Sequence, residues 1–261
     1  MDIRIDGRAA LITGGSKGLG LAMAKAFAEA GGKVAIVARD RDGLAKAEAV
    51  LKQAAPGAAV AAIAADISTA EGCSAVFENA VRALGQVDIL VNNAGTSQRG
   101  PFLEHSDAIW QADLDLKLFA AIRLARAAWP GMVARRWGRV INVLNIGAKA
   151  PLGTSAPTSV SRAAGMALTK VLANEGAPHN VLVNALLVGI IESDQWVRRH
   201  AREQRNISWD DWKAEQGKSV PLGRIGKPEE FAAMALLLAS EAGGYVTGTA
   251  INVDGGRSPV V

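Results

Sequence analysis

The chain has 261 residues, of which 49% are hydrophobic, and a formal net charge of +4 at pH 7. This composition is rich enough in apolar residues for a sizeable core and excludes a disordered chain. Lysine and arginine alternate with aspartate and glutamate and form no basic stripe, which argues against nucleic-acid binding. The single cysteine, Cys73, excludes an internal disulfide, and the three scattered histidines predict no metal site.

The ends and apolar runs of the sequence bear on where the protein works. The N-terminus has no apolar segment after a basic start, so we expect no signal peptide. No apolar run reaches about 18 residues, so no membrane-spanning helix is expected. These features predict a cytoplasmic protein.

Short apolar runs alternate with segments of helical period along the chain. The predicted strands are residues 9–13, 33–38, 59–64, 88–91, 139–143, 181–187 and 250–253. The predicted helices are residues 19–30, 41–54, 69–84, 107–134, 158–175 and 228–239. Continuous apolar strands indicate burial on both faces. The alternation predicts an α/β fold of the Rossmann type, a doubly wound parallel sheet, as one domain over residues 1–261.

Residues 192–217 interrupt this alternation. The segment is polar and contains Trp196, Trp209 and Trp212. We expect it to form a helical lid on the substrate side of the domain, because such covers close over substrate and exclude water. Its tryptophans favour an apolar or aromatic small-molecule substrate.

A glycine-rich loop follows the first predicted strand and opens the first predicted helix. Glycines allow a tight turn and close approach of a pyrophosphate, and the helix N-terminus offers free N–H groups. The sequence therefore predicts a dinucleotide site. Its contacts in this loop are Thr13, Gly14, Ser16, Lys17, Gly18, Leu19 and Gly20.

The spacing T-G-x-x-x-G-x-G in this loop resembles the classical short-chain dehydrogenase/reductase family. Further matching segments are Asn92-Asn93-Ala94-Gly95, Pro221-Leu222-Gly223-Arg224 and Asp254-Gly255-Gly256. The resemblance implies a seven-stranded parallel sheet, a nicotinamide cofactor, and a homotetramer or homodimer. The cofactor contacts that it implies outside the loop are Asp66, Ile67, Asn93, Ala94, Gly95, Arg162, Gly189 and Ile191.

The end of the second predicted strand determines which nicotinamide cofactor is expected. An acidic residue there would bind the ribose hydroxyls of NAD and repel a 2′-phosphate. Arg39 stands at this end, and an arginine can bind a phosphate in bidentate geometry. Lys17 adds a second cation, so NADP(H) is predicted. The alternative is that Asp40 binds the ribose and the cofactor is NAD(H).

The family's catalytic Asn–Ser–Tyr–Lys tetrad is replaced at every position. The resemblance places Thr158 at the tyrosine, Arg162 at the lysine, Asn145 at the serine and Lys117 at the asparagine. The only tyrosine, Tyr245, precedes the last predicted strand. Thr158 cannot simply stand in for a tyrosine, because its hydroxyl is far less acidic and its side chain is shorter.

The replacements suggest a different division of roles. We expect Lys117 to be the acid/base, Asn145 to bind the substrate carbonyl and Arg162 to anchor the cofactor and its charge. The alternative for Lys117 is a surface ion pair with Asp113, four residues earlier. Weaker substrate-side candidates follow the fourth predicted strand and the Asn145 segment. They are Ser97, Gln98, Arg99 and Lys149.

Three functions are compatible with these residues. The first is an NADP(H)-dependent oxidoreductase with an atypical proton donor, supported by the complete cofactor motifs. The second is a non-redox enzyme on the same fold, such as a dehalogenase or a lyase. The third is a cofactor-binding pseudoenzyme that acts as a sensor or an inactive subunit.

Overall fold

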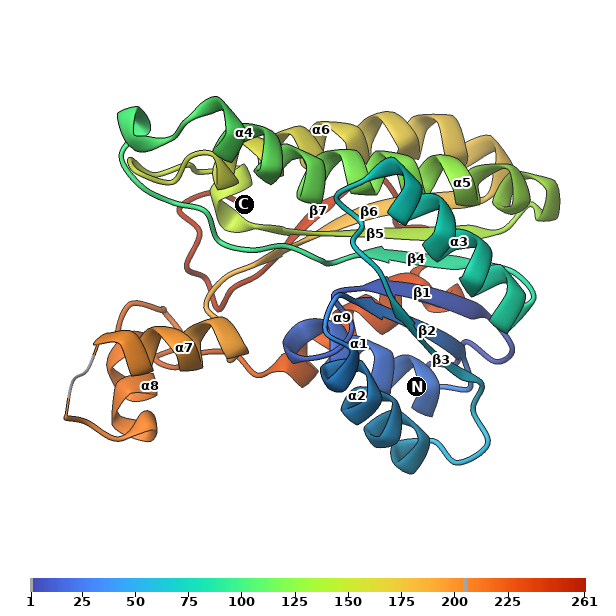
Figure 1. The fold of residues 1–261 in the computed structure, drawn as a ribbon, viewed down its shortest axis with the longest axis horizontal. Coiled ribbons are helices and arrows are strands. Elements are labelled where there is room, and N and C mark those ends of the chain that lie inside the picture. The colour runs from blue at the N-terminus through green and yellow to red at the C-terminus, as the bar shows by residue number, and fades with distance from the viewer. Residues whose placement is uncertain (1, 204–205) are drawn as a thin grey trace.

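The computed structural model describes residues 2–203 and 206–261 and contains one parallel β-sheet. Its strands are β1 (Ala9–Thr13), β2 (Lys33–Ala38), β3 (Val60–Ala64), β4 (Ile89–Asn92), β5 (Gly138–Asn145), β6 (Val181–Val188) and β7 (Ala250–Val253). The seven strands lie in the order β3-β2-β1-β4-β5-β6-β7, and every neighbouring pair is parallel. This confirms the predicted doubly wound sheet (Figure 1).

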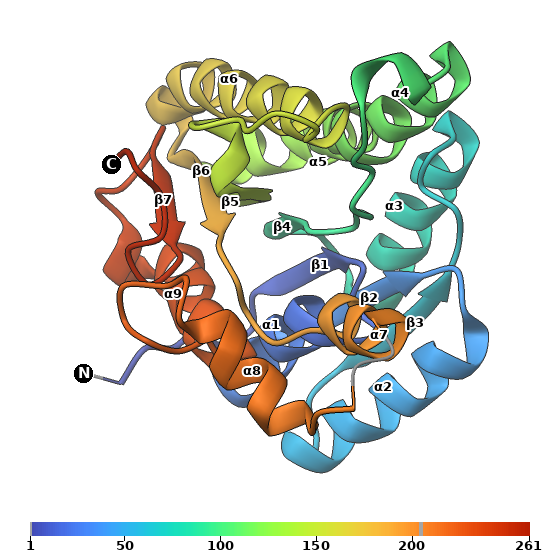
Figure 2. The same cartoon turned by 90° about the vertical axis from the view of Figure 1, so that its left-hand side faces the viewer.

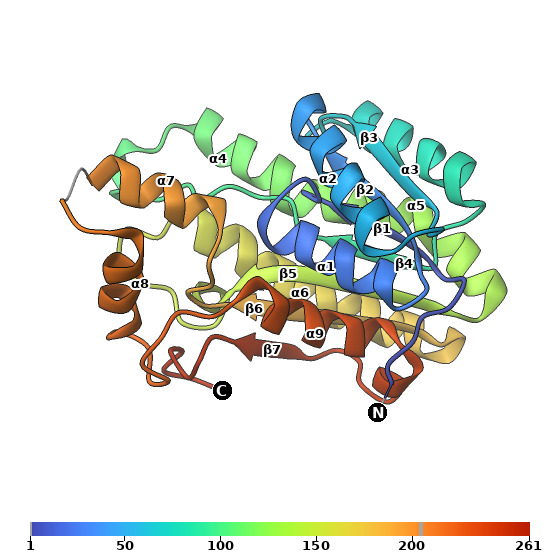
Figure 3. The same ribbon diagram turned by 90° about the horizontal axis from the view of Figure 1, so that it is seen from below.

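Helices cover both faces of the sheet. They are α1 (Gly18–Glu29), α2 (Arg41–Ala54), α3 (Ala70–Leu84), α4 (Asp107–Leu114), α5 (Ala120–Arg135), α6 (Thr158–Gly176), α7 (Asp194–Glu203), α8 (Trp209–Gly217) and α9 (Pro228–Ala239). Helices α1, α2 and α9 cover one face (Figure 3), and α3, α5 and α6 cover the other. No helix in the described part of the chain is both long enough and apolar enough to cross a membrane.

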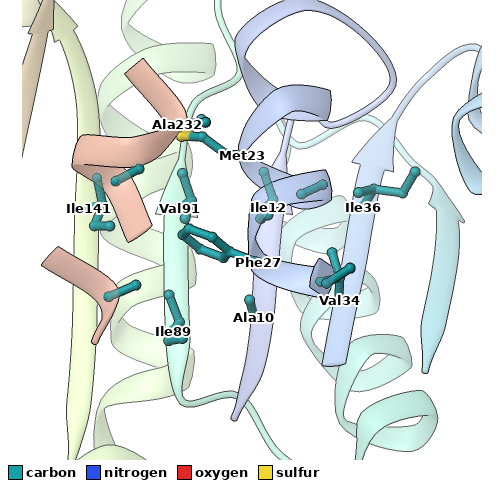
Figure 4. Packing of buried hydrophobic residues seen from close by; sticks show 14 of the residues in the cluster. Ala10, Ile12, Met23, Phe27, Val34, Ile36, Ile89, Val91, Ile141 and Ala232 are labelled. Atoms are coloured by element: carbon teal, nitrogen blue, oxygen red, sulfur yellow. The ribbon is translucent and has the colours of Figure 1, made fainter. Parts of the chain in front are cut away.

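The core consists of two layers because successive strand residues point to opposite faces of the sheet. In β1, Ile12 packs toward α1, α2 and α9, whereas Leu11 packs toward α3 and α5. Phe27 of α1 lies between strand side chains such as Ile12 and Val91 in the first layer (Figure 4). All of these side chains are fully buried, so the two layers fix the sheet and its carboxyl edge.

The predicted helix 107–134 is interrupted in the structure. Helix α4 passes into a π-helical turn, η2 (Asp115–Phe119), before α5 begins. A π-turn inserts one extra residue into the helical repeat and is frequent at functional sites. Lys117 lies in the middle of this turn and is buried.

The carboxyl ends of the strands face the viewer in Figure 2. The order of the sheet reverses between β1 and β4, and open α/β sheets bind ligands in the crevice at such a switch point. Helices α7 and α8 extend beyond this edge (Figure 1, Figure 2). The fold thus places the glycine loop, the end of β5 and the 192–217 segment around one region.

Candidate active site

The glycine loop between β1 and α1 has the geometry of a phosphate cradle. Gly14 and Gly18 have φ angles of +66° and +55°, a region that side-chain-bearing residues rarely adopt. A Cβ atom on Gly20 would lie 2.1 Å from the Gly14 carbonyl oxygen. The first turn of α1 therefore stands close against the loop, with its N–H groups directed outward. These observations fit the diphosphate of a dinucleotide.

Thr13 does not line the cavity in front of this loop, contrary to the prediction. It is buried beneath the loop, where its hydroxyl donates to the Val91 carbonyl at 3.3 Å. The same hydroxyl accepts hydrogen bonds from the N–H groups of Asn93 at 2.9 Å and Ala94 at 3.0 Å. Thr13 therefore joins β1 to the segment after β4. Its effect on a ligand is indirect, because its hydroxyl is already bonded to backbone groups at the end of β4.

One cavity of about 1280 Å³ opens at the carboxyl edge of the sheet. It includes all of the predicted cofactor residues except Thr13. Those that line it are Gly14, Ser16, Lys17, Gly18, Leu19, Gly20, Arg39, Asp66, Ile67, Asn93, Ala94, Gly95, Arg162, Gly189 and Ile191. Of the four predicted catalytic residues, Asn145, Thr158 and Arg162 line it and Lys117 does not.

Arg39, Asp40 and Asp66 line the cavity beside the carboxyl ends of β2 and β3. The family resemblance predicts the adenosine of a dinucleotide here, and this region is called the adenosine end below. Asp40 caps α2, accepting a hydrogen bond from the Asp42 N–H at 3.2 Å. The pKa of Asp66 is lowered, mainly by the hydrogen bond from the Ser68 N–H and in small part by Arg39. Because the Asp40 carboxylate is already bonded as the N-cap of α2, Arg39 is the group more available to bind a ligand at this end.

A buried polar cluster connects the π-turn to α6. The Lys117 side chain is fully buried, and its Nζ donates to the Asp113 carboxylate and, at 2.8 Å, to Thr158 Oγ1. Asp113 also accepts a hydrogen bond from Ser161 Oγ at 2.6 Å. The ion pair with Asp113 exists, but the alternative that it lies at the surface is wrong, because the pair is buried. The π-turn and the packing of α6 enclose it.

Burial changes the proton affinity of this cluster. Burial and the neighbouring Arg162 cation lower the pKa of Lys117 to about 8, and Asp113 offsets only part of this effect. Burial also lowers the pKa of Arg162 to about 10, so Arg162 remains a cation at neutral pH. Its Nη1 donates to the Val143 carbonyl at 2.8 Å. The site thus contains one amine that can exchange a proton near neutral pH and one permanent cation.

Thr158 links this cluster to the loop after β4. Its hydroxyl accepts from the Gln98 N–H at 2.9 Å and from Lys117, and donates to the Gln98 carbonyl at 2.7 Å. It is the cavity-lining residue that Lys117 contacts directly through a hydrogen bond. Thr158 therefore places the amine of Lys117 one hydroxyl away from the cavity.

Asn145 stands at the end of β5 and lines the same cavity. Its Oδ1 is buried and has no hydrogen-bond partner among the described residues. Buried polar atoms without partners are rare and require a ligand, a water molecule or a functional reason. Asn145 therefore lines the cavity with an amide whose Oδ1 has no partner in the described part of the chain.

The other substrate-side candidates differ in whether they line the cavity. Ser97 and Arg99 line the cavity. Gln98 does not, and its backbone N–H and carbonyl are hydrogen-bonded to the Thr158 hydroxyl. Lys149, a weaker candidate, does not line the cavity, and its Nζ donates to the Ala250 carbonyl at 2.7 Å. Tyr245 is fully exposed and does not line the cavity, which leaves no tyrosine at the site.

The 192–217 segment forms helices α7 and α8 and a small aromatic cluster. The rings of Trp209 and Trp212 are stacked with centroids 5.2 Å apart, and His200 contacts both rings edge-on. Trp212 is fully buried, whereas Trp196 lines the cavity. The apolar or aromatic substrate predicted from these tryptophans therefore rests on Trp196.

A family model, curated relatives and solved structures all indicate the same protein family for this chain. The family model described as enoyl-(acyl carrier protein) reductase matches residues 14–258. The 3-oxoacyl-[acyl-carrier-protein] reductase of Aquifex aeolicus is 33% identical over 259 residues, covering 98% of this chain and 99% of that protein. L-sorbose reductase from Gluconobacter frateurii, solved with NADPH and L-sorbose, is 37% identical over 100% of both chains, with a TM-score of 0.95.

A further similar structure is a short-chain oxidoreductase from Pseudomonas aeruginosa PAO1. It is described as NADPH-bound and as containing an atypical catalytic centre. It is 39% identical, covers 99% of this chain and 100% of its own, and has a TM-score of 0.91. The family match, the sheet order and the glycine loop agree, and the chain belongs to the short-chain dehydrogenase/reductase family of oxidoreductases.

Proposed function

We propose that this protein is an NADP(H)-dependent oxidoreductase that interconverts a carbonyl and an alcohol at an atypical catalytic centre. The observation that carries this proposal is the arrangement of one cavity. The phosphate loop and Arg39 lie at one end, and Asn145, Thr158 and Arg162 lie at the other. The buried amine of Lys117 contacts this second end through Thr158.

The proposed cofactor preference follows from charge. Arg39 and Lys17 line the adenosine half of the cavity, where a 2′-phosphate distinguishes NADP from NAD. The Gluconobacter and Pseudomonas proteins are both described with NADPH. Ile67, Asn93, Ala94, Gly95, Gly189 and Ile191 then form the apolar and backbone walls around the dinucleotide.

The chemistry divides between the cofactor and the chain. When bound, the nicotinamide supplies or accepts the hydride. The Asn145 amide holds the substrate oxygen, and the Arg162 cation anchors the nicotinamide ribose and stabilises negative charge that develops nearby. Lys117 acts as the proton reservoir. It passes a proton to Thr158 Oγ1 while the Thr158 hydroxyl proton moves to the substrate oxygen.

This relay requires Thr158 to release one bond. The Thr158 hydroxyl proton is directed at the Gln98 carbonyl, 2.7 Å away, and must turn toward the cavity. The same observation favours the second candidate function, a cofactor-binding pseudoenzyme, in which Thr158 only holds the loop after β4 in place.

For either function, we propose that the 192–217 segment is a lid over a small-molecule substrate. We also propose that the protein is a homo-oligomer.

A titration tests the cofactor half of the proposal. Calorimetry with NADPH and NADH should give tighter binding of NADPH, and Arg39→Ala should remove about 10- to 100-fold of that preference, the range of a charge-assisted bond. Lys33→Ala removes a partly buried cation at the start of β2, the strand that Arg39 follows. Lys33 lies outside the cavity, so this variant serves as the control. Equal affinity for both dinucleotides in the unaltered protein would overturn the NADP(H) assignment.

Turnover tests the catalytic half. Oxidation of NADPH is followed at the nicotinamide absorbance with a panel of ketones, aldehydes and oxo acids. Substrate-dependent loss of this absorbance supports the oxidoreductase. Tight NADPH binding without turnover across the panel would support the pseudoenzyme instead.

A further inference from the structure

The charges lining the cavity are unevenly distributed. The acidic side chains among its described lining residues are Asp40 and Asp66, and both lie at the adenosine end. Apart from Lys17 in the glycine loop, the remaining charged lining residues beyond that end are all arginines. They are Arg99, Arg162, Arg199 and Arg202. A cavity lined by one sign of charge concentrates ligands of the opposite sign.

Of these arginines, Arg99 is both firmly held and unpaired. Its backbone forms an antiparallel bridge with Pro157, and the preceding Gln98 is bonded through its N–H and its carbonyl to Thr158. Its side chain is exposed and has no hydrogen bond or ion pair with any described residue. The chain therefore fixes the position of Arg99 at the cavity wall without supplying a partner for its guanidinium.

The other arginines have different surroundings. Arg162 is buried and bonded to the Val143 carbonyl, and Arg199 is paired with Glu203 at 2.7 Å. Arg202 lies near the end of α7. The segment that leads into α7 stands over the phosphate loop, since Ser193 Cβ lies 3.8 Å from where a Cβ on Gly18 would be. Arg199 and Arg202 belong to the helix that this segment leads into, so we assign them to the dinucleotide phosphates. Arg99 is then the arginine that remains to bind the substrate.

The buried cluster next to Arg99 also carries excess positive charge. Lys117 and Arg162 are both cations below about pH 8, and Asp113 is the carboxylate paired with the cluster. Uncompensated charge in a site shielded from water is unfavourable, and a bound anion relieves it. Asn145 completes the site, because it lines the same cavity and a side-chain amide can hydrogen-bond a hydroxyl or carbonyl oxygen.

We propose that the substrate carries an anionic group, a carboxylate or a phosphate, which Arg99 binds while its hydroxyl or carbonyl lies at Asn145. This inference rests on the proposed function and names its substrate class: hydroxy and oxo acids, or phosphorylated hydroxy ketones. Arginine binds both anions in bidentate geometry, so the shared recognition chemistry is a planar guanidinium facing two anionic oxygens.

Matched pairs of probes test the charge directly. Calorimetry on the complex of the full chain with NADP⁺, which cannot reduce them, uses acetoacetate against methyl acetoacetate and dihydroxyacetone phosphate against dihydroxyacetone. At least one charged probe should bind about 10- to 100-fold more tightly than its neutral partner, the range expected for hydrogen bonds to a charged group. The first pair reports a carboxylate and the second a phosphate. Added salt should weaken the charged probe selectively.

Two variants test whether Arg99 is the residue that causes tighter binding of the charged probe. Arg99→Gln should remove the advantage of the charged probe and leave the neutral probe and NADP⁺ unchanged. Arg126→Gln, an exposed arginine on α5 outside the cavity, should change neither. Equal binding within both pairs, no binding of either charged probe at millimolar concentration, or an unchanged advantage in Arg99→Gln would each overturn the inference.

The two proposals fail differently. Turnover of neutral carbonyls with no preference for charge would retain the oxidoreductase and overturn the anion site. Charge-selective binding that depends on Arg99, with no turnover of any probe by NADPH, would retain the anion site and overturn the catalytic proposal.

Discussion

At the scale of single residues, the environment of Lys117 is the feature on which the proposed chemistry depends. Its amine is enclosed by a carboxylate, a hydroxyl and a nearby guanidinium, all contributed by α4 and α6. An exposed lysine would hold its proton far above neutral pH and could not exchange it during catalysis. Burial lowers the pKa of this amine enough for the proton role that we propose for it.

Removing the amine should abolish turnover without affecting the cofactor. Lys117→Met is expected to lower kcat by about 10²- to 10⁴-fold, the contribution of a general acid, while NADPH affinity stays unchanged. Because this variant leaves Asp113 buried without its partner, the double variant Asp113→Asn, Lys117→Met serves as a second test. Lys25→Met, which removes an exposed helical ion pair with Glu29, is the control. Unchanged kcat in either Lys117 variant would refute the proton role.

The pH dependence should follow the same amine. Lys117 has a pKa of about 8, so its charged form dominates below that pH and its neutral form above it. Carbonyl reduction needs the charged form and should fall as pH rises above about 8, whereas alcohol oxidation should rise. Steady-state rates at saturating cofactor measure both limbs, and Lys117→Met should lose them. A reduction rate that stays constant from neutral to strongly alkaline pH would contradict the assignment.

At the scale of elements, helices α7 and α8 are stabilised by their own small core. The stacked rings of Trp209 and Trp212 are accompanied by hydrogen bonds from Trp212 Nε1 to Glu203 at 2.8 Å and from Trp209 Nε1 to Glu192 at 3.2 Å. These contacts lie apart from the two layers that cover the sheet. The segment can therefore loosen without unfolding the domain.

Truncating Trp212 should affect the lid selectively. Trp212→Ala removes a fully buried ring, a change that costs about 3–5 kcal/mol in protein cores. Limited proteolysis should then cut within residues 192–217, and KM for substrate should rise more than kcat falls. Trp137→Ala, which alters the main core, should instead lower the thermal midpoint of the whole domain. The same proteolysis pattern in both variants would contradict an independent lid.

At the scale of the whole molecule, the cavity extends along the carboxyl edge of the sheet on both sides of the switch point between β1 and β4. Its lining residues come from both halves of the chain. A ligand in this position binds only when β2, β4, β5 and β6 are all in register. Folding and cofactor binding should therefore be coupled.

Thermal unfolding measures this coupling. NADPH at about 100 times its Kd should stabilise the fold by about 2.7 kcal/mol, which corresponds to a rise of about 5–10 °C in Tm for a domain of this size. NADH at the same concentration should give a smaller rise, because it lacks the phosphate that Arg39 and Lys17 attract. Protein concentration is held constant, since an oligomer unfolds at a concentration-dependent temperature. No shift with either dinucleotide would remove the basis of the proposed function.

The sequence by itself determined the parallel sheet, the glycine loop and the presence of a single tyrosine, far from the predicted site. These follow from local rules: apolar strand runs, the backbone freedom of glycine, and the position of the only tyrosine, Tyr245. It also placed Asn145 and Arg162 correctly beside the cavity, through motif spacing alone. Local spacing predicts a residue's position where that position depends mainly on the end of one strand or one helix.

Only the tertiary structure decided what surrounds these residues. Spacing showed that Lys117 and Asp113 could pair, but the π-turn and the packing of α6 decided that the pair is buried and bonded to Thr158. The same holds for Thr13, buried beneath its loop, and for Lys149, turned toward β7. Burial depends on elements distant in the chain, and burial sets the pKa and the accessible chemistry of a side chain.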